Sequence, residues 1–505
     1  MKGSKWKTPA AALASGLLLA LAFPPLEWVL LLPLALVPFL AALASEQSRG
    51  RALVSGFLLG LAFWCASIPW IVHVVTRYGG QSPVMGVVCL VILAGILAEW
   101  PALAAWGAVS AGPPGSGWRL AAFPLLWMAC EHARSFVYGG FPWNLTAQAL
   151  YRHPIWLQSA SVWGAFGVGA LAVSVSSLLA FAAIRRRPGP LFGAAALALA
   201  AGAFGAARLA APESTDPAAG PPFRVALLQP NVSQEARLSG SDARNYRIVM
   251  EQARAAAAEA PFLIVIPESA FALYWDRSPM LRHDLSEVAR DSLVLFNDIE
   301  ELPDGRYYNV ARLLGAGGPV GKPYRKVHLV PFGEYVPLPK LFFFVRQVST
   351  EIGEFSAAKE PSLLSAGAAR IGVGVCYEIT YPDLVRREVG TLGANLLATI
   401  SNDSWYGRAG AQAQHFAGAV MRSVETKRCL LRAAITGISG IVDEKGRIQG
   451  ELPRDRAGIL RGTARLVSER TPWVRWGYGI PRVADALAAA VLLFGVARAR
   501  LRRRP

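Results

Sequence analysis

The sequence predicts a multi-span α-helical membrane bundle of about eight helices, joined to a layered α/β domain. The 505 residues are 53% hydrophobic and only 17% charged, with a mean hydropathy of +0.35, whereas soluble domains carry about 25% charged residues. The basic residues behind the net charge of +17 gather in short segments beside apolar runs. Further along, over 220–465, short β-rich runs alternate with helical ones.

Apolar runs of bilayer-spanning or nearly spanning length fill most of the chain up to residue 210. A helix needs about 20 residues to cross the hydrocarbon core, so the first, fifth and eighth predicted spans are short. Seven spans with one re-entrant segment fit the pattern nearly as well. The predicted spans cover 10–23, 27–45, 53–75, 85–110, 119–134, 160–184, 190–209 and 484–497.

The first apolar run has an alternative interpretation as a cleaved signal peptide, because Lys2, Lys5 and Lys7 precede it. The small-residue site at 42–44 lies too far from that run, however, and more apolar runs follow. We therefore interpret the run as a membrane span.

Charge placement predicts the topology. Eight spans put both termini on one side, and loops rich in Lys and Arg stay in the cytoplasm. This rule places the basic loops and tails inside and the long insert outside. We expect a membrane region of about seven helices over 1–211, a soluble domain over 220–467, and a C-terminal helix with a basic cytoplasmic tail over 483–505. Nucleic-acid binding is not indicated, because the soluble part has no basic stripe with interleaved aromatic residues.

Three ionisable residues, Glu99, Glu131 and His132, lie in or beside predicted spans. Such residues are functional candidates by default, but these three are sparse and lack the spacing of a proton relay. We expect structural pairing or interfacial placement. The segment 139–144 is expected in an outer loop, where lipid access is a hypothesis.

A Pro-, Ala- and Gly-rich stretch at 212–222 is predicted to link the two parts. The β/α alternation after it predicts a layered domain with buried strands. The predicted strands cover 224–229, 262–266, 292–297, 307–314, 369–375, 396–400 and 429–434. The predicted helices cover 242–259, 280–290, 381–390 and 412–426.

Three reactive side chains stand out in this domain. Glu268 follows an apolar strand, Lys326 lies in a polar segment, and Cys376 follows the strand 369–375. Strand ends are where open α/β sheets assemble their sites. A thiol attacks as the thiolate, so it needs a nearby base or positive charge. Glu268 can accept the thiol proton, and Lys326 can stabilise an oxyanion. Each residue alone has a structural interpretation, but together they predict a nucleophilic site.

The other cysteines give no sign of a second site. Cys65, Cys89 and Cys130 lie in apolar runs, where packing is the expected role. With Cys429 and Cys376 the total is odd, and no paired spacing indicates a disulfide framework.

The Glu–Lys–Cys trio resembles the triad of the nitrilase (carbon–nitrogen hydrolase) superfamily. The fuller pattern is similar to the apolipoprotein N-acyltransferase family within it. The stretch His-Leu-Val-Pro-Phe-Gly-Glu-Tyr at 328–335 is specific to that family, and the order of seven spans, insert and terminal span covers nearly the whole chain. Other matching stretches lie at 229–231, 267–269, 376–378, 402–407, 414–415 and 436–440.

The resemblance implies an αββα nitrilase-like catalytic domain on the periplasmic face of a bacterial inner membrane. It implies Glu268 as general base, Lys326 as oxyanion stabiliser and Cys376 as nucleophile.

By the same resemblance, Glu334 and Glu378 are supporting carboxylates, and Tyr377 lies beside the thioester. No cofactor and no metal are implied. His328 and His415 are possible ligands by residue type, but both lie in family motifs that use no metal.

The activity implied is transfer of a fatty acyl chain from a phospholipid to the N-terminal amino group of diacylglyceryl-cysteine on an apolipoprotein. It passes through a Cys thioester with ping-pong kinetics, and it is the last step of bacterial lipoprotein maturation. The implied partners are the phospholipid donor, the diacylated lipoprotein acceptor and the membrane, without nucleic acid. Nothing in the sequence demands a partner subunit, so we expect a monomer.

Two alternatives share parts of the pattern. A membrane-anchored amidase acting on small amides or nitriles would use the same three residues, but seven spans exceed what a tether needs. A transporter with a vestigial regulatory domain would require polar residues converging at mid-membrane, and few are found.

Overall fold

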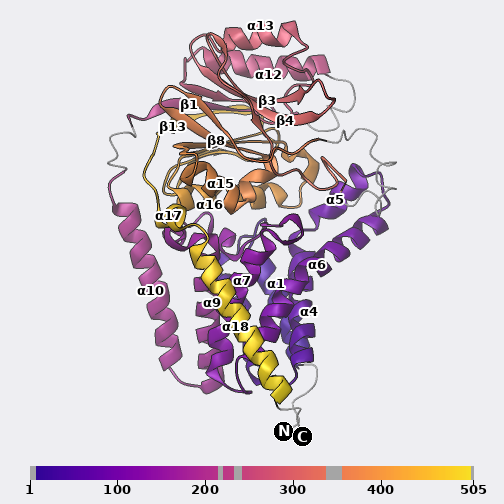
Figure 1. The fold of residues 1–505 in the computed structure, drawn as a ribbon, viewed down its shortest axis with the longest axis vertical. Coiled ribbons are helices and arrows are strands. Elements are labelled where there is room, and N and C mark those ends of the chain that lie inside the picture. Colours follow the sequence, from indigo (N-terminus) through magenta and orange to yellow (C-terminus); the bar gives the residue numbers. More distant parts are fainter. Residues whose placement is uncertain (1–6, 214–219, 233–241, 337–354, 502–505) are drawn as a thin grey trace.

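The computed structural model describes residues 7–213, 220–232, 242–336 and 355–501, and shows an α/β sandwich stacked on one end of a helical bundle (Figure 1). The predicted topology depends partly on terminal basic residues that lie outside the described residues, namely Lys2, Lys5 and the arginines at 502–504. The predicted fold class is confirmed, because apolar helices of membrane length precede an α/β domain with two sheets.

Four described helices are long and apolar enough to cross a membrane: α4 (Arg49–Ser67), α6 (Pro83–Ser110), α9 (Ala160–Arg185) and α10 (Gly189–Ala210). The predicted count of about eight spans therefore stays a prediction. The other helices of this part are α1 (Lys7–Leu21), η1 (Val29–Leu31), α2 (Leu32–Ala35), α3 (Val37–Ser45), α5 (Trp70–Arg77), α7 (Gly117–Arg134), η2 (Val137–Gly139), η3 (Thr146–Leu150), α8 (Pro154–Leu157), α17 (Pro472–Trp476) and α18 (Gly479–Leu501).

Prolines divide two of the predicted spans. The run 27–45 forms η1, α2 and α3 because Pro33 and Pro38 each stand at a helix start, where the missing N–H costs nothing. The run 53–75 is interrupted at Pro69, so α4 ends at Ser67 and α5 starts at Trp70. The helix α5 consequently lies beside the sandwich (Figure 1).

Small residues bring the bundle helices close together. A Cβ added at Gly56 of α4 would lie 2.5 Å from the Pro101 carbonyl oxygen of α6, and one at Gly16 of α1 would overlap the Leu59 carbonyl oxygen. Close backbone approach at small residues is a usual means of packing helices in lipid. The contacts of α4 with α1 and α6 therefore depend on these glycines.

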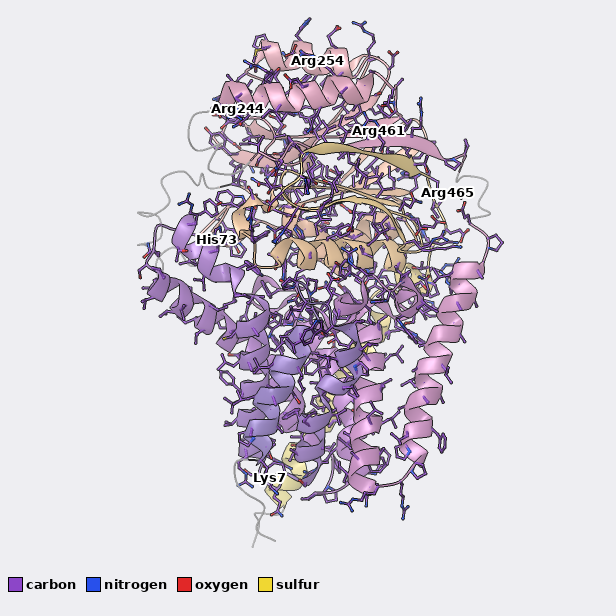
Figure 2. The ribbon with its side chains drawn as sticks, turned by 180° about the vertical axis from the view of Figure 1, so that it is seen from behind. Lys7, His73, Arg244, Arg254, Arg461 and Arg465 are labelled. Carbon is purple, nitrogen blue, oxygen red and sulfur yellow. The ribbon has the colours of Figure 1, made fainter. Side chains whose placement is uncertain are left out.

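Basic side chains gather at the end of the bundle away from the sandwich. Figure 2 shows Lys7 at that end. The next residue, Thr8, donates to Glu46, whose carboxylate also pairs with Arg51 at 2.7 Å. Arg119 donates to the carbonyl oxygens of Ala44 and Glu46, and Arg185 donates to the Gly115 carbonyl oxygen at 2.9 Å.

The domain contains two sheets. The first has the strand order β13-β1-β2-β3-β4-β5, with β6 paired to β4, and the second has the order β12-β11-β10-β9-β8-β7. The first sheet comprises β1 (Phe223–Gln229), β2 (Leu263–Val265), β3 (Leu293–Glu301), β4 (Tyr307–Gly315), β5 (Gly318–Pro319), β6 (Tyr324–Arg325) and β13 (Gly458–Ala464). The second comprises β7 (Leu363–Ala366), β8 (Ala369–Val375), β9 (Leu396–Ser401), β10 (Leu430–Ala434), β11 (Ser439–Val442) and β12 (Ile448–Leu452).

The sheets pack face to face through a core that includes Leu227 and Val265 from the first and Val373 and Ile400 from the second. Helices α12 (Asp242–Ala257) and α13 (Pro279–Val288) cover the outer face of the first sheet. Helices α15 (Pro382–Gly390) and α16 (Ala411–Thr426) cover the second and lie against the bundle (Figure 1). The layers are therefore αββα, and the α15–α16 layer forms the junction with the bundle.

Every strand and helix predicted for this domain is present, with ends shifted by a few residues. The strands β5, β6, β7, β11, β12 and β13 were not predicted from the sequence.

Replacing Gly56 by Ala should lower the free energy of unfolding by about 1–3 kcal/mol, because the new methyl group forces α4 away from α6. The loss should exceed the gain in helix propensity. Thermal unfolding of the purified protein in detergent measures it. The matched control is Gly95→Ala on α6, where the nearest atom would lie 3.8 Å away. Equal melting temperatures for the two variants would contradict the packing argument.

Candidate active site

Strand ends bring three predicted site residues together. Glu268 follows β2, Lys326 directly follows β6, and Cys376 directly follows β8. All three side chains are buried, with 6%, 1% and 6% of their residue surface exposed, respectively. Cys376 has a φ of 55°, the left-handed region that turns the chain sharply as β8 ends. Glu268 and Lys326 thus belong to the first sheet, and Cys376 to the second.

The Lys326 ammonium is held between two carboxylates. Its Nζ lies 2.9 Å from Glu334 Oε1 and 3.8 Å from Glu268 Oε1. Burial alone would lower the pKa of Lys326, but Glu334 and Glu268 outweigh it and raise the pKa above its usual value. Lys326 is therefore a permanent cation in this site.

Asparagines hold the carboxylates in place. Asn309 Nδ2 donates to Glu268 Oε1 at 3.0 Å and to Glu334 Oε1 at 2.9 Å. The second oxygen of Glu268 accepts the Asn402 backbone N–H at 2.9 Å. Asn297 donates to Asn309 Oδ1 at 2.7 Å and so orients that amide. Sequence reasoning singled out none of these as site residues, because each supports the site only through its partners in space.

The sulfur of Cys376 lies in a mixed electrostatic environment. Burial raises the pKa of the thiol, Glu268 raises it further, and Lys326 partly offsets both. Ser401 Oγ lies 3.5 Å from the sulfur. The neutral thiol is consequently favoured at neutral pH, and any attack by this sulfur would require its proton to leave.

Glu378 ties the two sheets together. Its Oε1 accepts the backbone N–H groups of Val327 at 2.7 Å and His328 at 2.9 Å. Its Oε2 accepts the Val375 N–H and the Tyr324 hydroxyl, both at 2.9 Å. The carboxylate thus fixes the segment after Lys326 to the end of β8. Burial raises the pKa of Glu378 to about 7, although Lys326 and the backbone donors favour the charged form.

Tyr377 reaches from the site to the bundle. Its ring stacks on Trp143 with centroids 6.0 Å apart, and its hydroxyl lies 3.4 Å from the Gly140 carbonyl oxygen. Both partners belong to the segment 139–144, so the segment predicted as an outer loop forms one wall of the site. Trp143 itself is only 1% exposed.

Gln414 of α16 fixes that wall. Its Oε1 accepts the indole N–H groups of Trp143 at 2.7 Å and Trp70 at 3.1 Å. Its Nε2 donates to the carbonyl oxygens of Ser67 at 2.7 Å and Pro24 at 3.0 Å. One amide therefore joins four segments of the membrane region to the sandwich.

A second buried cluster lies behind the sulfur. Asp403 Oδ2 pairs with Arg432 at 2.6 Å, and Oδ1 lies 3.0 Å from His415 Nδ1. His415 Nε2 lies 3.0 Å from the Cys376 carbonyl oxygen, to which it must donate. Burial and then Arg432 lower the pKa of His415, while Arg432 overcomes burial to hold the pKa of Asp403 well below its usual range.

Cys376, Asp403 and His415 hold ligand-type atoms within 4.8 Å of one another, which is a geometry that could hold a metal ion. The Arg432 guanidinium, however, already contacts Asp403 and lies 3.2 Å from His415 Nδ1. The positive charge that a metal ion would bring to these two side chains is therefore already present. The other histidine considered as a ligand and set aside, His328, stacks on Tyr381 with centroids 4.2 Å apart.

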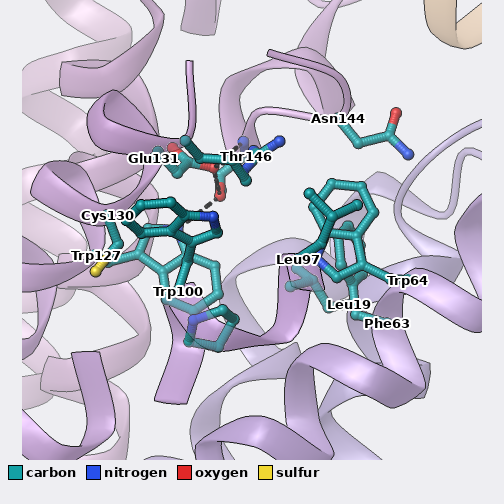
Figure 3. A pocket seen from close by; sticks show the side chains of 12 residues that line it. Leu19, Phe63, Trp64, Leu97, Trp100, Trp127, Cys130, Glu131, Asn144 and Thr146 are labelled. Atoms are coloured by element: carbon teal, nitrogen blue, oxygen red, sulfur yellow. Dashed lines mark hydrogen bonds and ion pairs between the residues drawn. The ribbon is translucent and has the colours of Figure 1, made fainter. Parts of the chain in front are cut away.

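The ionisable residues near the spans have structural partners or lie at the surface. Glu131 accepts from the backbone and hydroxyl of Thr146 at 2.7 and 2.8 Å, and His132 pairs with Asp485 at 2.7 Å. Glu99 is exposed on α6. Glu131 also borders a small cavity inside the bundle, whose walls include Trp64, Trp100, Trp127 and Asn144 (Figure 3).

Comparisons with known proteins cover both parts of the chain. Residues 15–178 match the family model described as "Apolipoprotein N-acyltransferase N-terminal domain", and residues 224–470 match "Carbon-nitrogen hydrolase". The apolipoprotein N-acyltransferase of Geobacter metallireducens is 36% identical, over 96% of this chain and 94% of that protein. Those of Methylococcus capsulatus and Vibrio cholerae are 33% and 29% identical, over 93% and 97% of this chain and 93% and 98% of those proteins.

Replacing each of two buried glutamates by glutamine should change the free energy of unfolding in opposite directions. Glu378→Gln should lower the free energy of unfolding by at least about 2 kcal/mol, because the new NH₂ group faces N–H and O–H donors. Glu388→Gln should instead raise it by more than about 1 kcal/mol, because burial raises the pKa of Glu388 well above its usual value, so the carboxyl is neutral in the folded protein but ionised in the unfolded chain, a cost that glutamine avoids. One oxygen of Glu388 also has no partner among the described residues. Denaturant unfolding at pH 7 measures both.

The pH dependence gives a second check. A carboxyl with a raised folded-state pKa stabilises the fold below its unfolded pKa, and that stability declines as pH rises. Wild type should therefore lose stability above about pH 4.5 through Glu388, and Glu388→Gln should show a flatter profile. Parallel profiles would show that Glu388 is ionised in the folded protein.

Proposed function

Because this chain belongs to the apolipoprotein N-acyltransferase family, we propose that it transfers a fatty acyl chain from a phospholipid to the N-terminal amino group of diacylglyceryl-cysteine on an apolipoprotein. This reaction completes bacterial lipoprotein maturation. The observation that carries the assignment is the meeting of Glu268, Lys326 and Cys376 in one buried site whose wall is formed by Trp143 of the membrane region.

In the first half-reaction, Cys376 attacks the ester carbonyl of the phospholipid while Glu268 takes the thiol proton. Lys326 stabilises the oxyanion of the tetrahedral intermediate. Glu268 then gives the proton to the departing lysophospholipid oxygen, which leaves an acyl thioester on Cys376. The raised thiol pKa fits this sequence, since deprotonation accompanies attack.

In the second half-reaction, the neutral α-amino group of the acceptor attacks the thioester. Glu268 accepts the amine proton and returns it to the departing Cys376 sulfur, so the amide forms and the enzyme is restored. Glu334 supports the reaction by keeping Lys326 in place, and Glu378 by fixing the sheets. Tyr377 lies next to the nucleophile, where it borders the acyl group.

The proposal includes a bacterial inner membrane with the sandwich on the periplasmic side. Lys7 lies at the opposite end of the bundle (Figure 2). Arg51 and Arg119 bond to Glu46, which is bonded to Thr8 beside Lys7, and Arg185 bonds to Gly115, whose N–H donates to Ala44. Basic loop residues favour the cytoplasm. A membrane region over 1–211, a catalytic domain over 220–467 and a terminal helix over 483–505 remain our proposed division. Phospholipid is the proposed donor, and the protein is proposed to act as a monomer.

Cys376→Ser should abolish transfer from labelled phospholipid to a diacylated lipopeptide by purified full-length protein in detergent. Serine is a far weaker nucleophile at this position, and its ester would not turn over as the thioester does. Lipopeptide mass and donor label measure the product. Wild type incubated with phospholipid alone should gain one acyl mass on the Cys376 peptide.

The matched control is Cys429→Ser, which replaces another buried cysteine just before β10 and should keep full activity. Transfer by Cys376→Ser, or an acyl adduct that persists in Cys376→Ala, would contradict the mechanism. Release of ammonia from small amides without lipid would favour an amidase instead.

A further inference from the structure

Ser401 lies beside the nucleophile because of the sheet register. In the parallel pair β8–β9, Val375 pairs with Ile400, so the residues that follow, Cys376 and Ser401, are neighbours where the strands end. The Ser401 hydroxyl oxygen is 3.5 Å from the sulfur, which is within hydrogen-bonding range for sulfur, and Ser401 is fully buried. The proposed reaction assigns this hydroxyl no role.

The Ser401 hydroxyl has one hydrogen and two acceptors. It lies 2.7 Å from Asp403 Oδ1 and 3.5 Å from the Cys376 sulfur. While the sulfur is a neutral thiol, the carboxylate is the stronger acceptor, so the hydroxyl donates to Asp403.

Asp403 keeps a charged partner when that hydrogen turns away. Its other oxygen retains the Arg432 contact at 2.6 Å. Gly437 lets this carboxylate fit, since any Cβ at that position would overlap Asp403 Oδ2. The cluster behind Ser401 is therefore rigid and charged, and only the hydroxyl torsion is free to change.

We propose that Ser401 is a further catalytic residue, which turns its hydroxyl hydrogen from Asp403 to the Cys376 sulfur whenever that sulfur becomes a thiolate. This inference rests on the proposed nucleophilic role of Cys376. The thiol proton goes to Glu268, and Ser401 loses no proton. When the thioester forms, the sulfur is neutral and the hydroxyl turns back to Asp403. When the acceptor amine expels the thiolate, the hydroxyl stabilises it again.

Asp403, Arg432 and His415 are positioning residues in this scheme. Arg432 keeps Asp403 ionised, and His415 holds the Cys376 carbonyl oxygen and so maintains the left-handed turn at the nucleophile. Other charged or titratable groups also act on the sulfur: Glu268 after β2, Lys326 after β6, and Tyr406 after β9. Ser401 is the group within hydrogen-bonding distance of the sulfur among the described residues.

The test reads the sulfur directly, without lipid substrates. Iodoacetamide alkylates the thiolate, so its rate at the Cys376 peptide, followed by mass spectrometry from pH 7 to 9, reports the thiolate fraction. Ser401→Ala should lower this rate about tenfold throughout the range, which corresponds to a rise of about one pKa unit. Ser401→Thr keeps the hydroxyl and should restore most of the rate. Full-length protein in detergent is used for every variant.

Thr399→Val is the matched control. Thr399 lies two residues earlier on β9, so it faces the same side of the strand, is buried, and has no hydroxyl partner among the described residues. This variant should alkylate as wild type does. A Ser401→Ala rate within twofold of wild type, or an equal fall in Thr399→Val, would overturn the proposal.

Asp403→Asn gives an opposite expectation and serves if Ser401→Ala does not fold. Removing the competing carboxylate should free the hydroxyl for sulfur and raise the alkylation rate, whereas an unchanged or lower rate would overturn the proposal. Because no acyl donor is present, a negative result here leaves the acyl-transfer assay of Cys376→Ser unaffected, and the two proposals fail separately.

Discussion

The rest of this site depends on a buried ammonium that two carboxylates hold. Lys326 has almost no contact with solvent, so its charge persists only because Glu334 and Glu268 face it. The same contact keeps Glu268, the proposed base, near enough to the sulfur to act on its charge. Asn309, bonded to both carboxylates, prevents either from turning away. A single ion cluster thereby sets the positions of the proposed base and the proposed oxyanion stabiliser together.

The αββα layers determine which site residues come from which sheet. Lys326 and Glu268 come from one sheet and Cys376 from the other, so the reaction needs the two sheets in a fixed relation. Glu378 supplies it by accepting N–H groups from the segment after β6 and from the end of β8. A neutral side chain there would leave several donors buried without an acceptor.

Local sequence was sufficient to predict the central strands and the residues at their ends. Buried strands such as β8 and β9 are continuous apolar runs, and Glu268 and Cys376 directly follow such runs. The edge strands were missed because β12 and β13 contain Gly and charged residues, and pairing with a distant partner makes them strands, as with β13 and β1. Asn309 and Ser401 could not be assigned, because their roles arise from contacts that no local pattern encodes. Gln414 lies in a stretch that matches the family, but its contacts with the bundle could not be predicted from that stretch.

Gln414 has a consequence for how large substrates reach the sulfur. All four hydrogen-bonding positions of its amide are occupied by the membrane region, at Pro24, Ser67, Trp70 and Trp143. Moving the sandwich away from the bundle would break all four bonds together. The indole N–H groups of Trp70 and Trp143 would then be left without their acceptor. The sandwich and the membrane region are therefore held together at this residue. On the proposed function, lipid substrates must reach the sulfur, and products must leave it, without opening this junction.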